Sequence, residues 1–240
     1  MGATLNPLRQ NRLSLRGTLV PVARRDILTQ NEQKSTQIGR SLESEYVVCN
    51  RPSQTGNRRF LRGNNLDVSI RKYRESDATN FYEAVLESVD HLSEWLPWCS
   101  ADYSISAALE WTKSAARTWE DGIDYRFLIE DSKTGKVLGS VGISQIIRQH
   151  KVGNLGYWVR KSAINQGVCT SAARQTVLFA FENLDFKRIE IHVQVENSAS
   201  NAVASRLGGH YEGTFRNKLI FNGKSVPAKC YSIIPSDYGV

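Results

Sequence analysis

The residues best suited to chemistry in this sequence lie in a strand, a loop and a helix start between Gly156 and Ala172. Gly156-Tyr-Trp-Val159 has the apolar pattern of a strand, and a loop containing Gln166-Gly167 leads into an apolar helix. The first N–H groups of a helix have no backbone partner, and the helix dipole adds positive charge there. The segment fits either a phosphate-binding site or a plain strand–helix connection.

The sequence of this loop matches neither of two well-known phosphate-binding motifs. The loop has neither the Gly-Lys-Ser/Thr of a P-loop nor the G-x-G-x-x-G of dinucleotide-binding folds. Backbone N–H groups would therefore supply most of the binding. Cys169 stands where the helix begins, so its thiol is either a reactive group or a small side chain that fills space.

The strand predicted over residues 187–195 carries a second group of polar side chains. Apolar residues alternate there with Arg188, Glu190, His192 and Gln194. Glu190 and His192 therefore share one face of the strand, where they could move protons through water. The same alternation is typical of an amphipathic strand whose polar face does no chemistry. Both interpretations stay open.

The elements that must position these groups follow from hydrophobic spacing. Apolar periodicity predicts a helix over residues 76–92, a helix ending at Gly122, and helices over residues 169–184 and 198–207. Alternation predicts strands over residues 66–73, 125–130, 137–147, 154–160, 187–195, 211–219 and 228–234. The order β-α-α-β-β-β-α-β-α-β-β has too many adjacent strands for a doubly wound fold. It predicts an α/β fold with a mixed sheet and helices on both faces.

The positive charge of the chain is concentrated at its N-terminal end. Of 31 Lys and Arg and 24 Asp and Glu, residues 1–63 hold 11 bases and 4 acids, so residues 64–240 are neutral overall. The first segment is expected to be a basic, disordered extension, an organellar transit peptide, or a tether to ribosome or RNA. Residues 64–240 are expected to form the folded domain, whose balanced charge gives no bulk reason to expect nucleic-acid binding.

Cysteine and histidine are too dispersed for a disulfide scaffold or a zinc site. The four Cys form no CxxC pair, and the four His are equally scattered, so the chain is expected to be reduced and to need no metal. No apolar run approaches the roughly 20 residues of a membrane-spanning helix. A soluble, cytoplasmic protein, either monomeric or homodimeric, is the expectation.

Several short motifs resemble, in their order, those of the GNAT N-acetyltransferases, and more narrowly those of the RimJ/RimL branch. They are Gly156-Tyr-Trp-Val159, the Gln166-Gly167 loop, Arg188-Ile-Glu190, Glu196-Asn-x-x-Ser200 and Ala204-x-x-Leu-Gly208. The resemblance covers about residues 66–235. It implies a GNAT-like fold with a strongly bent mixed sheet, in which two neighbouring strands diverge and admit the pantetheine arm of acetyl-CoA.

The resemblance also implies roles for single residues. Contacts to pantetheine would come from the backbones of Tyr157, Trp158 and Val159 and from Asn197, and Asn201 would also bind the cofactor. Amides that would bind the pyrophosphate belong to Gln166, Gly167, Val168, Cys169 and Thr170. Ser200 would lie near the thioester sulfur and protonate the departing thiolate. The further catalytic candidates are Asn197, Glu190 and His192.

The implied activity is transfer of an acetyl group from acetyl-CoA to a primary amine, by direct attack in a ternary complex. The acceptor would be a protein N-terminus, as in ribosomal-protein acetyltransferases, or a small molecule. Trp95 and Trp98 stand where relatives build the acceptor pocket, although they also fit simple packing of a lid. Ile164 departs from the family's loop pattern, and Leu219 stands where relatives have a Glu base. The alternative is an acyl-CoA-binding or interaction protein without catalysis.

Overall fold

The computed structural model describes residues 66–240, in which the elements follow the predicted order. The strands are β1 Val68–Lys72, β2 Tyr125–Asp131, β3 Val137–Ile147, β4 Val152–Val159, β5 Arg188–Gln194, β6 His210–Phe221 and β7 Lys224–Ile233. The helices are α2 Ala78–Leu86, α3 Val89–Leu92, α4 Ile105–Glu120, α5 Val168–Asn183 and α6 Ser198–Arg206. The predicted order is confirmed, with the short helix α3 as an addition.

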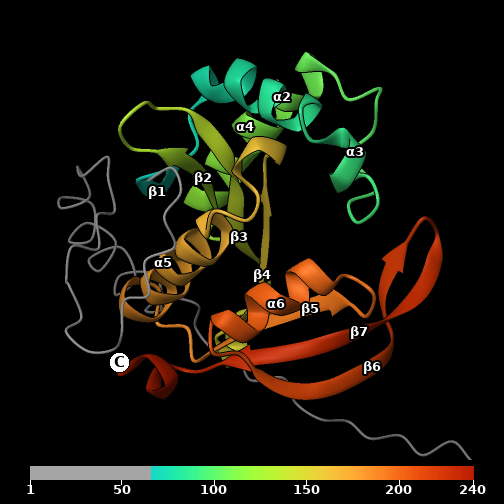
Figure 1. Cartoon of the computed structure of the whole chain (residues 1–240). Helices are drawn as coiled ribbons and strands as arrows, with labels where there is room; N and C mark the ends of the chain where they lie inside the picture. The colour runs from blue at the N-terminus through green and yellow to red at the C-terminus, as the bar shows by residue number, and fades with distance from the viewer. Residues whose placement is uncertain (1–65) are drawn as a thin grey trace, which may run out of the picture. The chain divides into compact units, whose positions relative to one another are not determined.

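The strands join one open sheet in the order β1-β2-β3-β4-β5-β7-β6 (Figure 1). Among these strands, β4 and β5 alone run parallel, and every other neighbouring pair is antiparallel. The predicted mixed sheet is therefore confirmed. Its one parallel pair lies in the interior of the sheet, with three strands on one side and two on the other.

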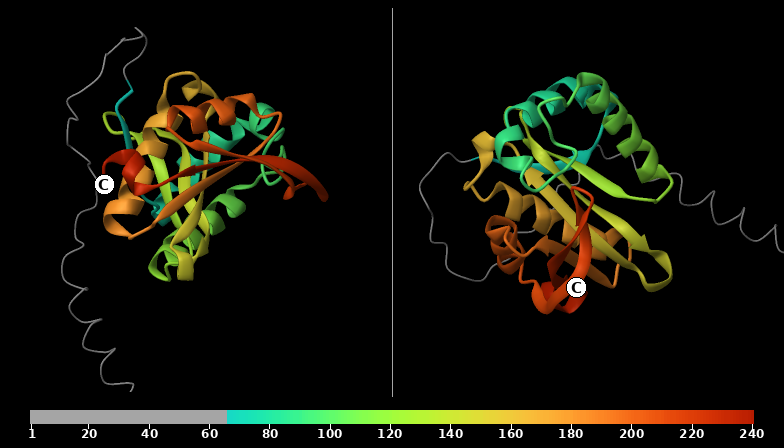
Figure 2. Two further views of the ribbon diagram at one scale, coloured as in Figure 1. Left: turned by 90° about the horizontal axis from the view of Figure 1, so that it is seen from below. Right: turned by 90° about the vertical axis from the view of Figure 1, so that its right-hand side faces the viewer.

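Helices cover both faces of this sheet (Figures 1 and 2). On one face α5 buries residues such as Val177 against the sheet. On the other face α2 and α4 bury Phe81 and Ala108. Phe127 and Leu128 are neighbours in β2 yet pack into different clusters, because successive side chains of a strand point to opposite faces. Each large apolar side chain buried in this way stabilises the fold by about 1.5–3 kcal/mol.

One predicted helix is shorter in the structure. Apolar spacing predicts a helix over residues 76–92, but α2 ends at Leu86 and α3 makes a single further turn. Ser88 is fully buried at the break, and its hydroxyl donates to the carbonyl of Ala84 at 2.6 Å. A serine bonded to its own helix in this way tends to bend it. The break turns Glu87 and Ser88 toward the chain that follows β4.

Membrane-spanning helices and clusters of metal-ligating side chains are both absent from residues 66–240. No helix in that range is long and apolar enough to cross a membrane. No group of three or more His, Cys, Asp or Glu in the same range could hold a metal ion. The basic extension predicted over residues 1–63, with its targeting or tethering roles, lies outside the described residues.

Candidate functional site

The parallel pair of strands separates within the sheet. β4 and β5 pair only from Val152 opposite Arg188 to Asn154 opposite Glu190. Beyond Asn154, β4 continues to Val159 with β3 as its partner. The two strands therefore diverge along the second half of β4, as the family resemblance implies.

The free edge of β4 offers backbone groups to a ligand. The N–H of Arg160 donates to the carbonyl of Leu138 in β3 at 2.8 Å, and the carbonyl of Trp158 also faces β3. Because backbone groups alternate in direction along a strand, those of Tyr157 and Val159 face the open side. An extended chain can bond to such an edge as an added strand. The backbone of Trp158, a third predicted contact, faces the other way.

Asn154 lies where the two strands separate. Its Oδ1 accepts a hydrogen bond from the backbone N–H of His192 at 3.3 Å. This bond satisfies a group of β5 that the backbone of β4 no longer reaches. Asn154 is not among the site residues predicted from the sequence. The available signal was a polar amide at the start of an otherwise apolar strand.

The loop after β4 presents unpaired N–H groups at the start of α5. Asn165 and Gly167 have left-handed backbone, with φ of 61° and 76°. The N–H of Ser171 donates to the carbonyl of Gly167 at 2.9 Å as the first bond of the helix. The N–H groups of residues 168–170 therefore lack a backbone partner among the described residues. With no acidic side chain in this first turn, the loop fits a phosphate group.

Two side chains of the loop have surroundings that bear on their roles. The Gln166 amide donates to the carbonyl of Ser162 at 2.7 Å, so it stabilises the loop itself. Burial raises the pKa of the Cys169 thiol to about 12, whereas a reactive thiol needs a lowered pKa. The structure therefore favours the interpretation of Cys169 as a small side chain that fills space.

Ser200 and Tyr157 meet across the split. The Tyr157 hydroxyl donates to the carbonyl of Ser200 at 3.1 Å, and the Ser200 hydroxyl donates to the Tyr157 oxygen at 3.2 Å. Asn197 caps α6, because its Oδ1 accepts from the N–H of Ser200 at 2.9 Å. Burial raises the pKa of Tyr157 well above its ordinary value. Both hydroxyls are therefore neutral donors at pH 7, and the tyrosine hydroxyl is a group that the motif comparison missed.

Asn201 holds the start of α6 in place. Its Nδ2 donates to the carbonyls of Asn197 at 2.8 Å and Val195 at 3.3 Å. Its Oδ1 accepts from the Tyr231 hydroxyl in β7 at 3.0 Å. The amide is thus fully engaged within the chain. This arrangement favours a role in positioning α6, and a direct contact between Asn201 and a cofactor stays a prediction.

Glu190 and His192 lie together in a half-buried polar cluster. His192 Nε2 is 2.9 Å from Glu190 Oε2, and Arg188 Nε donates to Glu190 Oε1 at 2.9 Å. Although burial raises it, the hydrogen bonds from Arg188 and His192 hold the pKa of Glu190 below its ordinary value. Burial, followed by the charge of Lys218, lowers the pKa of His192. At pH 7 the neutral ring therefore has its proton on Nε2, facing a carboxylate.

The other ring nitrogen of His192 carries a free lone pair. The side chain is 5% exposed, and Nδ1 makes no hydrogen bond within the described residues. A buried polar atom of this kind is costly unless water or a ligand meets it. By the strand register, His192 shares its face with Asn154, Gly156 and Trp158 of β4. A Cβ on Gly156 would meet open space. The unpaired Nδ1 of His192 therefore lies on a face of the sheet that has open space beside Gly156.

Trp98 borders the same face from the helix layer. Its ring centroid lies 6.1 Å from that of Trp158 and 6.3 Å from that of Trp111, and the residue is 41% exposed. Trp98 is therefore packed on one side and open on the other, which is compatible with both predicted roles. Trp95 is half-buried after α3 and makes no ring contact with the described part of the chain. The structure brings Trp98, and not Trp95, into ring contact with β4.

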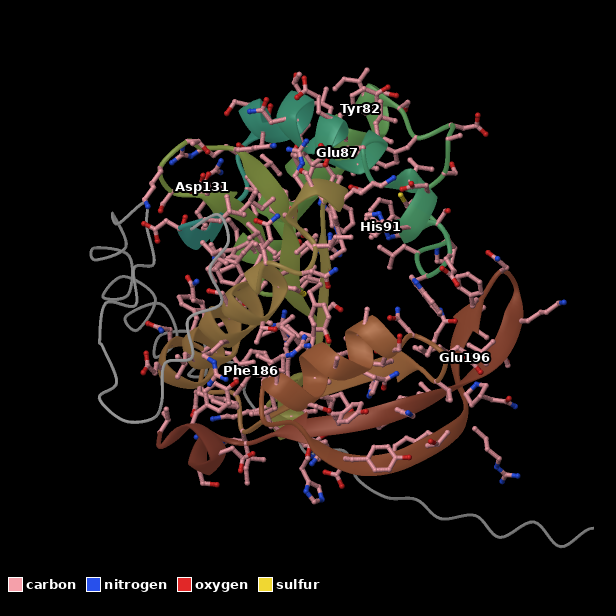
Figure 3. The ribbon with its side chains drawn as sticks, viewed as in Figure 1. Tyr82, Glu87, His91, Asp131, Phe186 and Glu196 are labelled. Carbon is pink, nitrogen blue, oxygen red and sulfur yellow. The ribbon has the colours of Figure 1, made fainter. Side chains whose placement is uncertain are left out.

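The turn between α2 and α3 is fastened to the chain that follows β4 (Figure 3). Glu87 accepts hydrogen bonds from the Arg160 guanidinium and, at 2.8 Å, from the N–H of Ser162. Ser88 Oγ accepts from the N–H of Lys161 at 3.0 Å. The hydrogen bond from Arg160 lowers the pKa of Glu87 to about 2. These contacts, here called the clamp, join the helix layer to the start of the loop that leads into α5.

His91 reaches the free edge of β4 itself. Its Nε2 lies 3.3 Å from the carbonyl oxygen of Val159, one of the groups on the open side. Figure 3 shows His91 between α3 and β4. A ligand that bonds to the Val159 carbonyl would replace His91 there. Neither the clamp nor this contact has a signal in the sequence, since each joins residues about 70 positions apart.

Comparisons with known proteins agree with this geometry. A model of the acetyltransferase (GNAT) domain family matches residues 67–210. The chain is 26% identical over 179 residues to the "Putative ribosomal N-acetyltransferase YdaF" of Bacillus subtilis strain 168, covering 72% of this chain and 94% of that protein. It is 22% identical over 155 residues to the ribosomal-protein-serine acetyltransferase of Escherichia coli K12, covering 65% and 86%.

A solved structure shares the architecture. The ribosomal L7/L12 alpha-N-protein acetyltransferase RimL, in complex with coenzyme A, matches with a TM-score of 0.65 at 23% identity. The match covers 71% of this chain and 95% of that one. At this identity the likeness concerns the fold, and it agrees with the predicted mixed sheet flanked by helices.

Proposed function

This chain belongs to the GNAT acetyltransferase family and is an N-acetyltransferase, and from this premise we propose that it acetylates a primary amine at a protein N-terminus, using acetyl-CoA. The relatives named as ribosomal acetyltransferases favour a protein acceptor over a small molecule. Transfer would occur by direct attack of the amine in a ternary complex.

The split between β4 and β5 is the observation that carries this proposal. It runs from the unpaired N–H groups of residues 168–170 to the face of His192. The loop would hold the pyrophosphate, because Gly167 and the bare N–H groups leave room for an anion. The free edge at Tyr157 and Val159 would hold the amide-containing pantetheine arm as an added strand. When bound there, acetyl-CoA supplies an activated acetyl thioester.

His192 is proposed as the group that removes the proton from the attacking amine. Its Nδ1 lone pair is free and its Nε2 proton faces Glu190. As Nδ1 takes the proton, the ring becomes positive, and the Glu190 carboxylate stabilises that charge. This pair would replace the carboxylate that relatives carry at the place of Leu219. Glu190 acts on the ring rather than on the substrate, so it is a positioning residue.

Two neutral hydrogen-bond donors would act on the thioester, one on its acetyl oxygen and one on the thiolate that leaves. An N–H on the free edge of β4 can donate to the acetyl oxygen as negative charge develops there. The Ser200 hydroxyl is proposed to protonate the thiolate that leaves. Tyr157 lies beside Ser200 and accepts the hydrogen bond of its hydroxyl, so it orients that hydroxyl. Asn197 holds Ser200 by capping its helix.

A thiol-release assay with acetyl-CoA tests the proposal. Full-length protein is incubated with peptides that have a free N-terminus, and with small amines in parallel. We expect release of coenzyme A with peptides and little with small amines. If isothermal titration detects no binding of acetyl-CoA, the whole proposal is wrong. If only small amines are acetylated, the choice of a protein acceptor is wrong.

A second candidate function has one observation in its favour. Leu219 lies within β6, opposite Val226 of β7, so no carboxylate occupies the position where relatives have the base. A protein that binds acyl-CoA without catalysis would show this feature. Acetyl-CoA binding with no thiol release over a broad amine panel would favour this candidate, and turnover of any amine would exclude it.

A further inference from the structure

The outer part of the β6–β7 hairpin is a two-stranded ribbon. β7 pairs with β5 only as far as Ala228, opposite Gln194, whereas its pairing with β6 continues out to Lys224. Residues 215–227, here called the ribbon, therefore extend past β5 without a third strand. Figures 1 and 2 show the hairpin projecting from the sheet, and in Figure 1 it lies on the same side as α3.

The ribbon concentrates positive charge. From Gly213 to Ser236 the sequence contains no Asp or Glu, and its bases are Arg216, Lys218, Lys224 and Lys229. Because residues 64–240 hold equal numbers of acids and bases, the rest of that range is acidic overall. None of the four bases forms an ion pair within the described residues. The fold leaves this charge free to attract an acidic partner.

Exposed apolar side chains and a groove accompany the charge. Phe215 is 45% exposed and Ile220 is 68% exposed. Between the pairs at Phe215 and Leu219, β6 carries residues 216–218 where β7 has only Pro227, so the ribbon bulges. An open groove of about 760 Å³ lies at this bulge, lined by Phe215, Arg216, Asn217 and Pro227. Aromatic and Arg side chains are enriched where proteins bind one another.

The bulge also connects the ribbon to the face of His192. The charge of Lys218 acts on both His192 and Cys230, which oppose each other in β5 and β7. Cys230 follows Pro227 of the bulge by three residues along β7, so the ribbon leads away from the position opposite His192. Lysines on an edge strand also hinder aggregation, but the exposed Phe215 and Ile220 would work against that purpose. A polypeptide whose amine lies at His192 can continue along the ribbon.

We propose that the ribbon binds an acidic segment of the acceptor protein, shortly after the N-terminus that is acetylated. This inference rests on the proposed function. The strand from Phe215 to Phe221 spans roughly 20 Å, so the carboxylates would fall within about the first eight acceptor residues. Arg216 and Lys224 would attract the carboxylates, while Phe215 and Ile220 would contact apolar side chains between them.

The test compares two peptides with the full-length protein. They share their first three residues, and one continues with Asp and Glu where the other has Asn and Gln. Fluorescence anisotropy in the presence of coenzyme A measures binding, and thiol release measures kcat/KM. We expect the acidic peptide to bind roughly tenfold more tightly at low salt, with the preference shrinking as salt screens the charges.

Matched charge reversals locate the effect. Arg216→Glu with Lys224→Glu should abolish the preference for the acidic peptide and leave binding of the neutral peptide unchanged. Lys133→Glu with Lys136→Glu makes the same charge change on exposed lysines of the β2–β3 turn, and it should keep the preference. Equal binding of the two peptides by the natural protein, or a preference that survives in the ribbon variant, would overturn the proposal.

Two further results distinguish binding of an acidic acceptor segment from binding of nucleic acid by the ribbon and from failure of the proposed acetylation. If the ribbon variant loses binding of a single-stranded RNA probe but keeps the peptide preference, the ribbon serves nucleic acid and the proposal is wrong. If neither peptides nor amines are acetylated, the proposed function fails by itself. The anisotropy preference still decides whether the ribbon binds acidic chains.

Discussion

At the scale of single residues, the candidate site depends on a few hydrogen bonds that can be removed one at a time. His192 has one nitrogen bonded to Glu190 and the other unpaired, and Ser200 shares a mutual bond with Tyr157. In both pairs a group proposed to touch the reactants is held by a second group. Substitutions can therefore distinguish loss of chemistry from loss of position.

His192→Gln is expected to lower kcat by about 10²–10⁴-fold, the usual contribution of a general base. Glutamine has similar size, so KM for acetyl-CoA should stay within about twofold. Because the pKa of His192 is lowered, its neutral form persists below the ordinary histidine pKa of about 6.5. Activity of the natural protein should therefore fall only at more acidic pH. A pH profile of kcat/KM measures this acidic limb.

Glu190→Gln serves as the control for that profile. Removing the carboxylate destabilises the protonated ring of His192, so the acidic limb should move to still lower pH. The limb should disappear altogether in His192→Gln. An unchanged acidic limb in His192→Gln would exclude this residue as the base.

Ser200→Ala is expected to lower kcat by about 10–100-fold with little change in KM for acetyl-CoA, because it removes a donor rather than a binding group. Tyr157→Phe should lower kcat less, since Ser200 remains. If the two hydroxyls act together, the double variant should be no worse than Ser200→Ala alone. Single-turnover kinetics measure the effect, and strictly additive losses would show that the hydroxyls act independently.

At the scale of elements, the clamp joins the break between α2 and α3 to the loop that begins α5. Helix periodicity predicted one continuous helix over residues 76–92, and it failed because tertiary hydrogen bonds at Glu87 and Ser88 outweigh local propensity. The same contacts position the start of the anion-binding loop. A change in the clamp is therefore expected to weaken the binding of coenzyme A that is proposed at this loop.

Glu87→Gln is expected to destabilise the fold by about 1 kcal/mol, a value reduced for the partial exposure of the carboxylate. The pKa of Glu87 is lowered to about 2 by Arg160. This ion pair therefore stabilises the protein above the ordinary glutamate pKa of about 4.3, and its contribution is lost as pH falls toward 2. Urea unfolding at pH 7 and at pH 3 measures the difference between the two proteins.

The clamp also predicts a kinetic effect of Glu87→Gln. KM for acetyl-CoA should rise severalfold while kcat changes little, because the loop is displaced and the reacting groups are not. Lys113→Gln, which removes an exposed partner of Glu75 on the same helix layer, is the matched control. Equal KM values in both variants would show that the clamp does not position the loop.

At the scale of the whole molecule, residues 66–240 form one sheet whose strands part at its parallel pair. A ligand that fills the split should bind the folded state and not the unfolded one. Its binding therefore couples to the stability of the whole sheet.

Acetyl-CoA at about 100 times its dissociation constant is expected to stabilise the protein by about 2.7 kcal/mol. For a domain of this size the Tm should rise by roughly 5–10 °C. Gly167→Val should lose most of this shift, because a β-branched residue at φ of 76° is strained and deforms the loop. Differential scanning calorimetry measures both values. An equal shift in the variant would place the cofactor away from this loop.

The sequence by itself determined the order of the elements, the glycine-containing loop before α5 and the alternating faces of β5. Each of these rests on periodicity or backbone geometry within a short stretch, such as Asn165 and Gly167 before α5. Only the tertiary structure decided which side chains meet, as Tyr157 does with Ser200 and Glu87 with Arg160, and that the charge of Lys218 acts on His192. Those partners lie 26 to 73 residues apart. The order of the strands and the breaks in strand pairing bring these distant residues together. Hydrophobic spacing along one strand or helix carries no information about the strand order or about the breaks in pairing.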